Sequence, residues 1–260
     1  MEGAFRMKSK CLILSVVVAL AGFQPQSKAS LILESAGSFA VLGGSTVTST
    51  GDTVLNGNLG VSPGTAITGF GPGTVNGATY AGGSVAAQAR SDALAAYNIL
   101  AGETGGSDLS GSDLGTHTLT SGVYSFSSSA QLTGILTLSG TGDFVFQIGS
   151  TLTTAGSSSI VLINGALAGN VFWQVGSSAT LGTGTSFYGS ILAGQSITFD
   201  TGASMSGSAL ALNGAVNMDD NSISITAVPE ATAFWPLVFC ASIFGGWQRL
   251  AVWRRKTGRS

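Results

Sequence analysis

The stretch FVFQIGSTLTTAGSSSIVLINGALAGNVFWQV, residues 144–175, decides the fold of this chain. It holds three short blocks of alternating apolar and small polar residues, at 145–148, 150–154 and 159–162, before the pattern starts again at residue 171. Alternation with a period of two is typical of a β-strand with one buried face. Gly, Asn, Asp and Ser separate the blocks and favour turns. The same pattern continues to residue 221.

Three blocks make one round of roughly 18 to 26 residues, a period typical of stacked repeats. Three strands per round predict a triangular β-solenoid. Because one coil cannot bury its own inward side chains, the coils must stack. Two earlier rounds begin at residue 38, with blocks at 39–42, 46–48 and 53–56 and then at 59–61, 65–68 and 74–76.

Residues 84–101 break the alternation and are rich in alanine, which predicts one α-helix. Ser84 is the expected N-cap, and Gly102 follows the last helical residue. The predicted apolar side holds Val85, Ala89, Leu94, Tyr97 and Leu100, with Gln88, Asp92 and Asn98 turned away from it. A lone helix must bury its apolar side, so we expect it to pack on an outward apolar side of the solenoid, formed by Val145, Phe146, Val171, Phe172 and Trp173.

The N-terminus, residues 1–29, is predicted to be a secretory signal peptide. Arg6, Lys8 and Lys10 precede an apolar core at residues 11–23, which is too short to span a membrane. Ser27-Lys28-Ala29 fits the small-x-small cleavage rule, which places the solenoid domain at residues 30–228. A retained anchor is the alternative.

The tail, residues 229–260, contains an apolar segment at 231–247 that is about one bilayer crossing long. Five basic residues follow it: Arg249, Arg254, Arg255, Lys256 and Arg259. An apolar segment followed by a basic cluster is the order of a stop-transfer signal. A buried C-terminal helix is the alternative, and the positive charges disfavour it.

The predicted domain is acidic. Between residues 30 and 228, ten carboxylates face a single base, Arg90, which gives a net charge of −9. Without a basic patch, nucleic acid is excluded as a partner. Both cysteines, Cys11 and Cys240, lie outside the domain, so a disulfide framework and a thiol nucleophile are excluded within it.

The sequence shows no catalytic constellation. The single histidine, His117, lies in a Gly, Ser and Asp linker at residues 103–117, and the domain has no cluster of transition-metal ligands. Asp219 and Asp220 form a carboxylate pair that we interpret as a turn in the last coil, with an acid–base couple as the alternative. We therefore expect a protein that is not an enzyme and needs no metal or cofactor.

Hydroxyl groups recur on the second strand of each round. The inward positions of this strand are predicted to be Val47, Ile67, Leu132, Leu152, Leu181, Ile197 and Val216. The candidate site consists of outward residues beside them: Thr46, Thr48, Thr65, Thr68, Thr133, Thr151, Thr153, Thr180, Ser196, Thr198 and Asn217. Stacking places such residues in ranks about 4.7–4.9 Å apart, as a flat grid. Gln131, Ala215 and Asn217 interrupt the threonines, and Phe199 and Asp200 are expected to add bulk and charge nearby. Threonine is also common on exposed strands, so a purely structural face stays open.

Over residues 38–225 the chain resembles the bacterial and fungal ice-binding proteins. The matching stretches are GVSPGTAITGF (60–70), SDALAAYN (91–98), LTSGVY (119–124), NVFWQV (170–175) and GSILA (189–193). The resemblance implies a mainly β fold, a discontinuous right-handed β-solenoid with a long helix packed along one face. It implies that the N-terminal coils close back on the C-terminal ones. It also implies an ice-binding face on the strands that begin near Ser45 and Thr65.

The tail resembles a PEP-CTERM sorting signal. Val228-Pro229-Glu230 precedes an apolar segment and an Arg-rich end, although Ala231 stands where the motif usually has a second proline. Such tails are cleaved by a membrane exosortase. The resemblance implies export to the cell surface or extracellular matrix, with transient membrane anchoring through the tail.

Together these features predict an exported protein that adsorbs to ice, or to ordered water, through the grid and inhibits ice growth or recrystallisation. The alternative is a surface adhesin or matrix protein that uses the same fold to contact extracellular polysaccharide or cells without ice activity. An enzyme built on a β-helix is a third and weaker hypothesis, for want of a base or a metal site.

Overall fold

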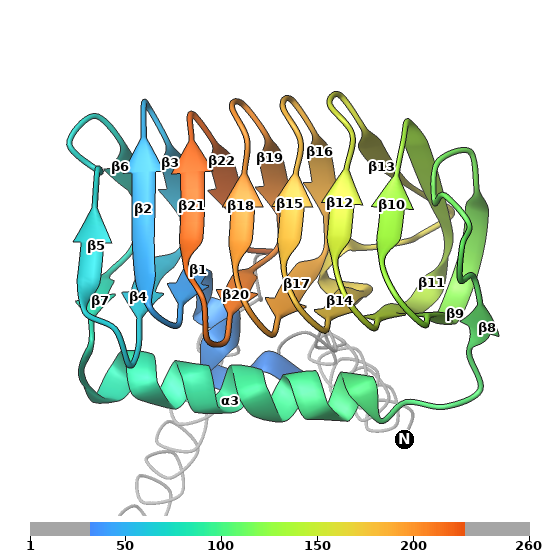
Figure 1. Ribbon diagram of the computed structural model, residues 1–260, viewed down its shortest axis with the longest axis horizontal. Coiled ribbons are helices and arrows are strands. Elements are labelled where there is room, and N and C mark those ends of the chain that lie inside the picture. The colour runs from blue at the N-terminus through green and yellow to red at the C-terminus, as the bar shows by residue number, and fades with distance from the viewer. Residues whose placement is uncertain (1–31, 227–260) are drawn as a thin grey trace, which may run out of the picture. The chain divides into compact units, whose positions relative to one another are not determined.

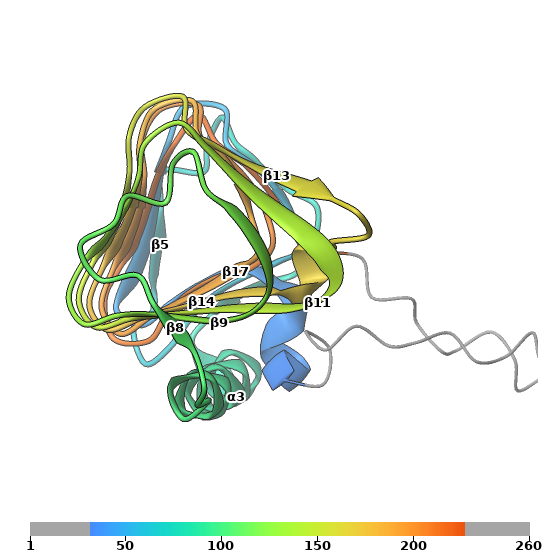
Figure 2. The ribbon, with the colours of Figure 1, turned by 90° about the vertical axis from the view of Figure 1, so that its right-hand side faces the viewer.

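The computed structural model describes residues 32–226, which form a three-sided stack of coils, seen end on in Figure 2. The predicted signal peptide at residues 1–29 and the predicted sorting tail at residues 229–260, with Val228, Pro229 and Glu230, lie outside the described residues. Within residues 32–226, no helix is both long and apolar enough to cross a membrane.

One side of the stack is a seven-stranded parallel sheet, which we call the hydroxyl side (Figure 1). From one end of the stack to the other its strands are β10 (Ala130–Leu132), β12 (Leu152–Thr154), β15 (Ala179–Leu181), β18 (Ile197–Phe199), β21 (Val216–Asp219), β2 (Thr46–Thr50) and β5 (Ala66–Thr68).

The other two sides belong to one fifteen-stranded sheet. Two strands, β9 (Thr118–Phe126) and β11 (Ile135–Ile148), run through the corner between them, and β11 pairs with β13 by its first half and with β14 by its second. The serine side continues with β13 (Ser159–Ile163), β16 (Ser186–Tyr188), β19 (Ser204–Ser206), β22 (Ser222–Ser224), β3 (Val54–Asn56) and β6 (Thr74–Val75). The helix side continues with β14 (Val171–Val175), β17 (Ser190–Ala193), β20 (Ala209–Ala211), β1 (Phe39–Gly43), β4 (Asn58–Val61) and β7 (Thr79–Ala81). At one end, β8 (Ser107–Asp108) pairs with β9.

The coils are not stacked in chain order. β1 pairs with β20, β2 with β21 and β3 with β22, all in parallel, so the first coil lies on the last one. This confirms the predicted discontinuous order. The chain must then travel back along the stack to begin its remaining coils, and it does so through α3 (Gly83–Ala101) (Figure 1). The 19 residues of α3 span about 28 Å at a rise of about 1.5 Å per residue. That length matches six strand spacings of about 4.8 Å.

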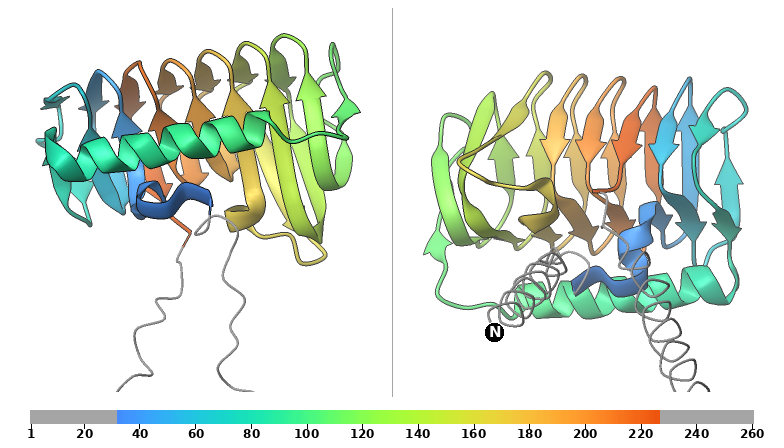
Figure 3. Two further views of the ribbon diagram at one scale, coloured as in Figure 1. Left: turned by 90° about the horizontal axis from the view of Figure 1, so that it is seen from below. Right: turned by 180° about the vertical axis from the view of Figure 1, so that it is seen from behind.

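The helix lies across the strands of the helix side (Figure 3). Its buried apolar residues are Ala86, Ala89, Ala93, Ala96 and Leu100. They pack on outward side chains of the sheet: Leu42, Val145, Phe172, Leu192 and Leu210. Val85 and Leu94, predicted for the apolar side, are 47% and 43% exposed, so the predicted stripe is wrong there. Alanines occupy the buried positions of the helix because their small side chains let the helix approach the sheet closely.

Two further details of the helix prediction are wrong. Gly82 and not Ser84 is the N-cap, and no side chain caps the helix. Asp92, predicted to face away, is buried, and it accepts hydrogen bonds from the Ser35 hydroxyl and from Gln88 Nε2 (2.8 Å). Ser35 belongs to the short 3-10 helix η1 (Glu34–Ser38), which packs beside α3. The carboxylate is tolerated there because it is hydrogen-bonded.

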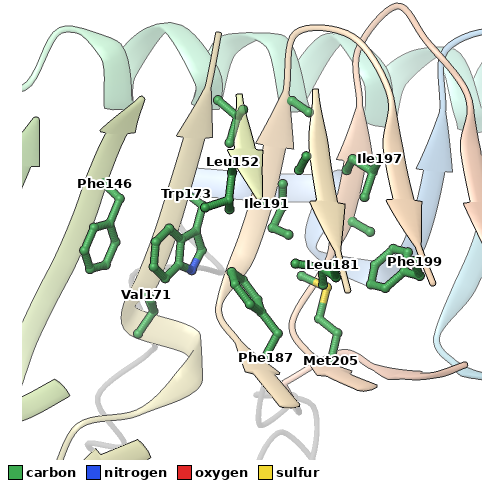
Figure 4. Packing of buried hydrophobic residues seen from close by; sticks show 14 of the residues in the cluster. Phe146, Leu152, Val171, Trp173, Leu181, Phe187, Ile191, Ile197, Phe199 and Met205 are labelled. Carbon is green, nitrogen blue, oxygen red and sulfur yellow. The ribbon is translucent and has the colours of Figure 1, made fainter. Parts of the chain in front are cut away.

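Inside the stack, side chains from all three sides form one core (Figure 4). The Trp173 ring stacks on Phe146 with centroids 3.9 Å apart and packs against Phe187 at 5.0 Å. Phe146, Val171 and Trp173 were predicted to face outward, but they point into this core. Val145 and Phe172 contact the helix cluster as predicted, since successive residues of a strand face opposite ways. A second short 3-10 helix, η2 (Ala168–Asn170), precedes β14.

Glycines stack at the corner between the helix side and the hydroxyl side. A Cβ atom on Gly176 would lie 2.4 Å from the carbonyl oxygen of Gly149, and one on Gly194 would lie 2.5 Å from that of Gly176. A side chain at any of these positions would push the coils apart. The glycines therefore let successive coils turn at the same place, so that the strands of the hydroxyl side start in line.

Candidate functional site

Seven outward side chains run in one line along the middle of the hydroxyl side. We call this line the central rank, and strand pairing places in it Gln131, Thr153, Thr180, Thr198, Asn217, Thr48 and Thr68. Parallel in-register strands space neighbours about 4.8 Å apart, so the rank is about 29 Å long. All seven were predicted to face outward, and six of them belong to the candidate site. Gln131 and Asn217 were also named as interruptions of the threonines, and Gln131 was left out of the site.

A second line, the flanking rank, lies on the same face two residues earlier along each strand. It consists of Ser129, Thr151, Ser178, Ser196, Ala215, Thr46 and Ala66. Thr46 pairs directly with Ala66. The backbone amides of Ala130 and Ala179 donate to the carbonyl oxygens of Thr151 and Ser196 and extend the same register (both 2.9 Å). The two ranks are about 6.6 Å apart.

Two predicted site residues fall outside these ranks. Thr65 precedes β5, and Ala66 takes the place beside Thr46. Thr133 follows Leu132, which pairs with Thr154 and not with Leu152, so Thr133 lies at the margin of the sheet. Near Thr65 and Thr133, small polar and small apolar side chains do not alternate clearly. The local sequence therefore does not show which residues face outward, and only the strand pairing does. The prediction also missed Ser129, which accepts a hydrogen bond from Thr151 Oγ1 (2.8 Å).

Three threonines at the middle of the central rank present unused hydroxyl groups. The side chains of Thr153, Thr180 and Thr198 make no hydrogen bond to any residue within 32–226, and they lie on three consecutive strands. Thr48 differs, because its hydroxyl donates to Asn217 Oδ1 (2.7 Å). The middle of the face therefore offers hydroxyl donors and acceptors to water, each beside a methyl group.

Charge lies at the borders of the face: Asp113 pairs with Gln131 at the β10 end of the sheet, and Asp219 lies at one margin. Asp219 accepts hydrogen bonds from the hydroxyls of Thr201 and of Thr50 (2.7 Å to Thr50), and these bonds, the one from Thr201 above all, hold the pKa of its carboxyl below the usual range. Neither rank contains a charged side chain, so a neutral face has an anionic edge. Phe199 was expected to add bulk near the face, and this is wrong: it is 1% exposed and points into the core (Figure 4).

The junction between the first and last coils crosses the hydroxyl side between β21 and β2. Two side-chain hydrogen bonds link the coils across this junction. In the central rank Thr48 Oγ1 donates to Asn217 Oδ1, and two residues further along the strands Thr50 Oγ1 donates to Asp219 Oδ1 (2.7 Å). At the other end of these strands, the amide of Ser45 donates to the carbonyl oxygen of Gly214 (3.0 Å). The junction is as continuous as any other pair of strands, and it leaves no step in the face.

Asn221, a buried residue, fixes the turn that follows β21 in the last coil. Asn221 is 2% exposed, and its Nδ2 donates to the carbonyl oxygens of Asp200 (2.9 Å) and Ala203 (3.1 Å). Its Oδ1 accepts from the amide of Asp219 (2.5 Å). Satisfying three backbone groups with one side chain fixes the turn that ends the face.

The other two sides of the stack are less suited to a flat contact. The helix side is covered by α3 (Figure 3). The serine side carries in-register Ser186, Ser204 and Ser222, but Tyr188 stands in the next line beside Ser206. Toward one end of that side, Ile135, Val161 and Ile163 are 54%, 39% and 39% exposed. The serine side is thus uneven and partly apolar.

The remaining polar candidates form no reaction centre. Asp220 has a positive φ of 53°, and its Oδ1 accepts from the amide of Asp52 (2.6 Å), as expected of a turn residue. His117 is partly exposed, and its amide donates to the carbonyl oxygen of Leu114 (3.3 Å). Within residues 32–226, no three residues of the His, Cys, Asp and Glu types gather in a group able to hold a metal ion.

The chain is similar in sequence to a protein family and to several relatives. The family model described as Ice-binding-like matches residues 41–224. An ice-binding protein of Nostoc sp. (strain HG1) is 57% identical over 226 residues, which cover 84% of each chain. An ice-binding protein of Leucosporidium sp. (strain AY30) is 33% identical over 209 residues, or 70% of this chain and 80% of its own.

Solved structures agree with the sequence comparison. The crystal structure of an ice-binding protein from an Antarctic biological consortium matches with a TM-score of 0.72 at 48% identity, over 74% of this chain and 90% of its own. That of an ice-binding protein from the Antarctic ascomycete Antarctomyces psychrotrophicus matches with a TM-score of 0.72 at 40% identity, over 75% of this chain and 98% of its own.

Proposed function

This chain belongs to the Ice-binding-like family, and we propose that it adsorbs to ice through the central and flanking ranks of the hydroxyl side. The observation that carries the choice of face is the set of free hydroxyls on Thr153, Thr180 and Thr198. They stand in register at the middle of a flat, uncharged sheet. The ice-binding relatives from Nostoc and Leucosporidium support the activity itself.

The mechanism follows from the repeat of the strands. Small side chains that recur about every 4.8 Å along the stack and about 6.6 Å across it hold water in a regular array. Methyl groups limit the number of positions that a water can occupy, and hydroxyls hydrogen-bond the waters that remain. Such an array joins the growing ice surface, and the adsorbed protein then blocks further growth and recrystallisation around it.

Rigidity makes the array effective. The inward residues of the same strands, such as Leu152, Ile197 and Val216, are fully buried, and backbone pairing holds every strand on both sides except at the two ends. A surface that is already ordered loses little conformational entropy when it binds. The anionic margin at Asp219 lies outside the ranks, where it favours solubility without disturbing the contact.

We further propose that the protein works outside the cell. The basic start and apolar core within residues 1–29 support a secretory signal, and Val228, Pro229 and Glu230 with the Arg-rich end support a sorting tail processed by an exosortase-type enzyme. An apolar segment at residues 231–247 would hold the chain at the membrane until that step. Contact with extracellular polysaccharide would follow from delivery to a surface matrix.

The test of the function is ice shaping and recrystallisation inhibition by purified residues 30–228. We expect faceted crystals and small grains at micromolar protein. Round crystals and normal grain growth, together with retention on immobilised polysaccharide, would instead favour the adhesin alternative. Protein labelled with a fluorophore and incorporated into a single ice hemisphere would show which crystal planes it binds.

A further inference from the structure

A hollow of about 310 Å³ lies on the helix side and reaches the corner with the hydroxyl side, where the C-terminal end of α3 meets strands β9, β11 and β14. Its polar lining comes from Asp108, Ser125, Ser127, Gln147 and Gln174. We call it the glutamine pocket. Its volume is at the lower end of the range of about 300–1,000 Å³ that is usual for small-molecule sites.

The side-chain amide of Gln174 opens onto the pocket. The residue is 7% exposed and lines the pocket, yet its side chain forms no hydrogen bond with any residue in the described part of the chain. Its amide nitrogen and oxygen are open to solvent at the pocket, so they are available to a ligand. Apolar Leu192 occupies the equivalent outward position on the next strand, so the sheet itself does not require an amide here.

The neighbouring glutamine shows the contrast. Gln147 pairs in register with Gln174, and its Nε2 donates to the carbonyl oxygens of Leu100 (2.7 Å) and Glu103 (2.8 Å) at the end of α3. Gln147 is therefore fixed by the helix terminus, and its own carbonyl oxygen remains as an acceptor beside the pocket. Gln147 is thus part of the pocket wall, whereas the amide of Gln174 is available to a ligand.

The chemistry of the lining selects the occupant. The pocket offers two hydroxyls, two side-chain amide groups and one carboxylate, and it has no cationic side chain. A mixed set of donors and acceptors suits groups that both donate and accept, as hydroxyls do. The Asp108 carboxylate accepts from the amide of Ser110 (2.9 Å) and disfavours an anionic ligand. Ala101 supplies a small apolar contact.

We propose that the glutamine pocket binds one neutral sugar ring or a polyol of similar size, with Gln174 hydrogen-bonding adjacent hydroxyl groups. This site is separate from the ice-binding ranks and does not depend on them. The pocket is open and small, so a single ring fits it, and its affinity for a free monosaccharide is expected to be weak, with a Kd on the order of 1 mM.

The experiment is saturation-transfer-difference NMR with the full chain and a panel of glucose, galactose, N-acetylglucosamine and glycerol, followed by titration of whichever ligand gives a signal. Gln174→Leu removes the amide, and we expect it to weaken binding at least tenfold. Gln195→Leu is the matched control, because it makes the same change at an exposed glutamine outside the pocket and should leave binding unchanged. Ser127→Trp blocks the pocket from an exposed position and serves if Gln174→Leu does not fold.

The outcomes separate the sources of the ligand. Signals from glucose, galactose or N-acetylglucosamine indicate that a sugar ring is the ligand, whereas signals only from glycerol indicate a small polyol. No saturable signal from any of them at 50-fold the expected Kd, roughly 50 mM, would overturn the proposal, and so would binding that survives both Gln174→Leu and Ser127→Trp. Ice shaping should be the same in Gln174→Leu as in the parent protein, since Gln174 lies on the helix side and outside the ranks.

Discussion

Thr198 is the central member of the seven-membered central rank, and replacing it with tyrosine should abolish ice activity. The rank extends for three strands on either side of Thr198, about 14 Å each way. A tyrosine ring there rises several ångströms above its neighbours, which are threonines and an asparagine. A gap of only 0.5–1 Å already forfeits a quarter to a half of a van der Waals contact. The ring would therefore hold most of the face off the ice.

The expected size of the effect is at least a tenfold rise in the protein concentration that inhibits recrystallisation, equivalent to about 1.4 kcal/mol of adsorption free energy. Stability should change little, because the Thr198 side chain is partly exposed and forms no hydrogen bond within residues 32–226, and such substitutions usually stay within about 0.5 kcal/mol. The melting temperature, followed by circular dichroism, therefore serves as the internal check. Thermal hysteresis in single crystals gives a second reading of activity.

Ser204→Tyr is the matched control on the serine side, at a partly exposed and in-register position. It should keep full activity. Thr68→Tyr, at the end of the central rank, should lose less activity than Thr198→Tyr. If Thr198→Tyr remains fully active while Ser204→Tyr loses activity, the assignment of the face is wrong and the serine side binds ice.

Three further perturbations test the packing that supports the face. Ala93→Leu should destabilise the protein by about 1–3 kcal/mol, seen as a lower urea midpoint, because Ala93 is fully buried between helix and sheet. Asn221→Ala should cost about 1–3 kcal/mol for each backbone group left unpaired, and an unchanged midpoint would contradict that role. Burial opposes the shift at Asp113, but hydrogen bonds from Thr133 and Gly115 outweigh it and hold the pKa of this carboxyl below its ordinary value of 3.8. Its contribution to stability is present above pH 3.8 and is lost as the pH falls through the lower folded pKa, so Asp113→Asn should show a smaller loss of melting temperature on acidification than the parent.

Much of the architecture could be predicted because it is repeated locally. Each coil carries its own alternation and its own turns, so three strands per round and the inward residues and outward threonines of the hydroxyl side follow from the period of two. On the helix side, where both faces of the strands are apolar, the alternation did not show which residues of β11 and β14 point inward. The order of the coils is different. Nothing in residues 39–56 says that they pair with residues 209–224, since every coil offers a similar edge to every other, and only the resemblance to a family implied this order.

The errors have physical causes of the same kind. Thr65 and Thr133 were placed in the grid because a threonine one residue before or after a strand looks like one within it, and register is fixed by pairing and not by local sequence. Val85 and Leu94 were favoured over alanines because larger side chains bury more area. In the structure the helix lies too close to the sheet for larger side chains, so the alanines are the buried residues. The sequence does not reveal this separation.

The discontinuous order of the coils also sets the size of the proposed site. The strands from residues 130–219 supply only five members of the central rank, ending at Asn217. β2 and β5 from the N-terminal coils add Thr48 and Thr68, which lengthens the rank from about 19 Å to about 29 Å. α3 makes this possible, because a helix of that length is what the chain needs to return to the far end of the stack. A contact that depends on many small, regularly spaced groups gains with every added strand. The helix thus contributes to the site without touching it, by letting the first coils of the chain complete a face begun by the last.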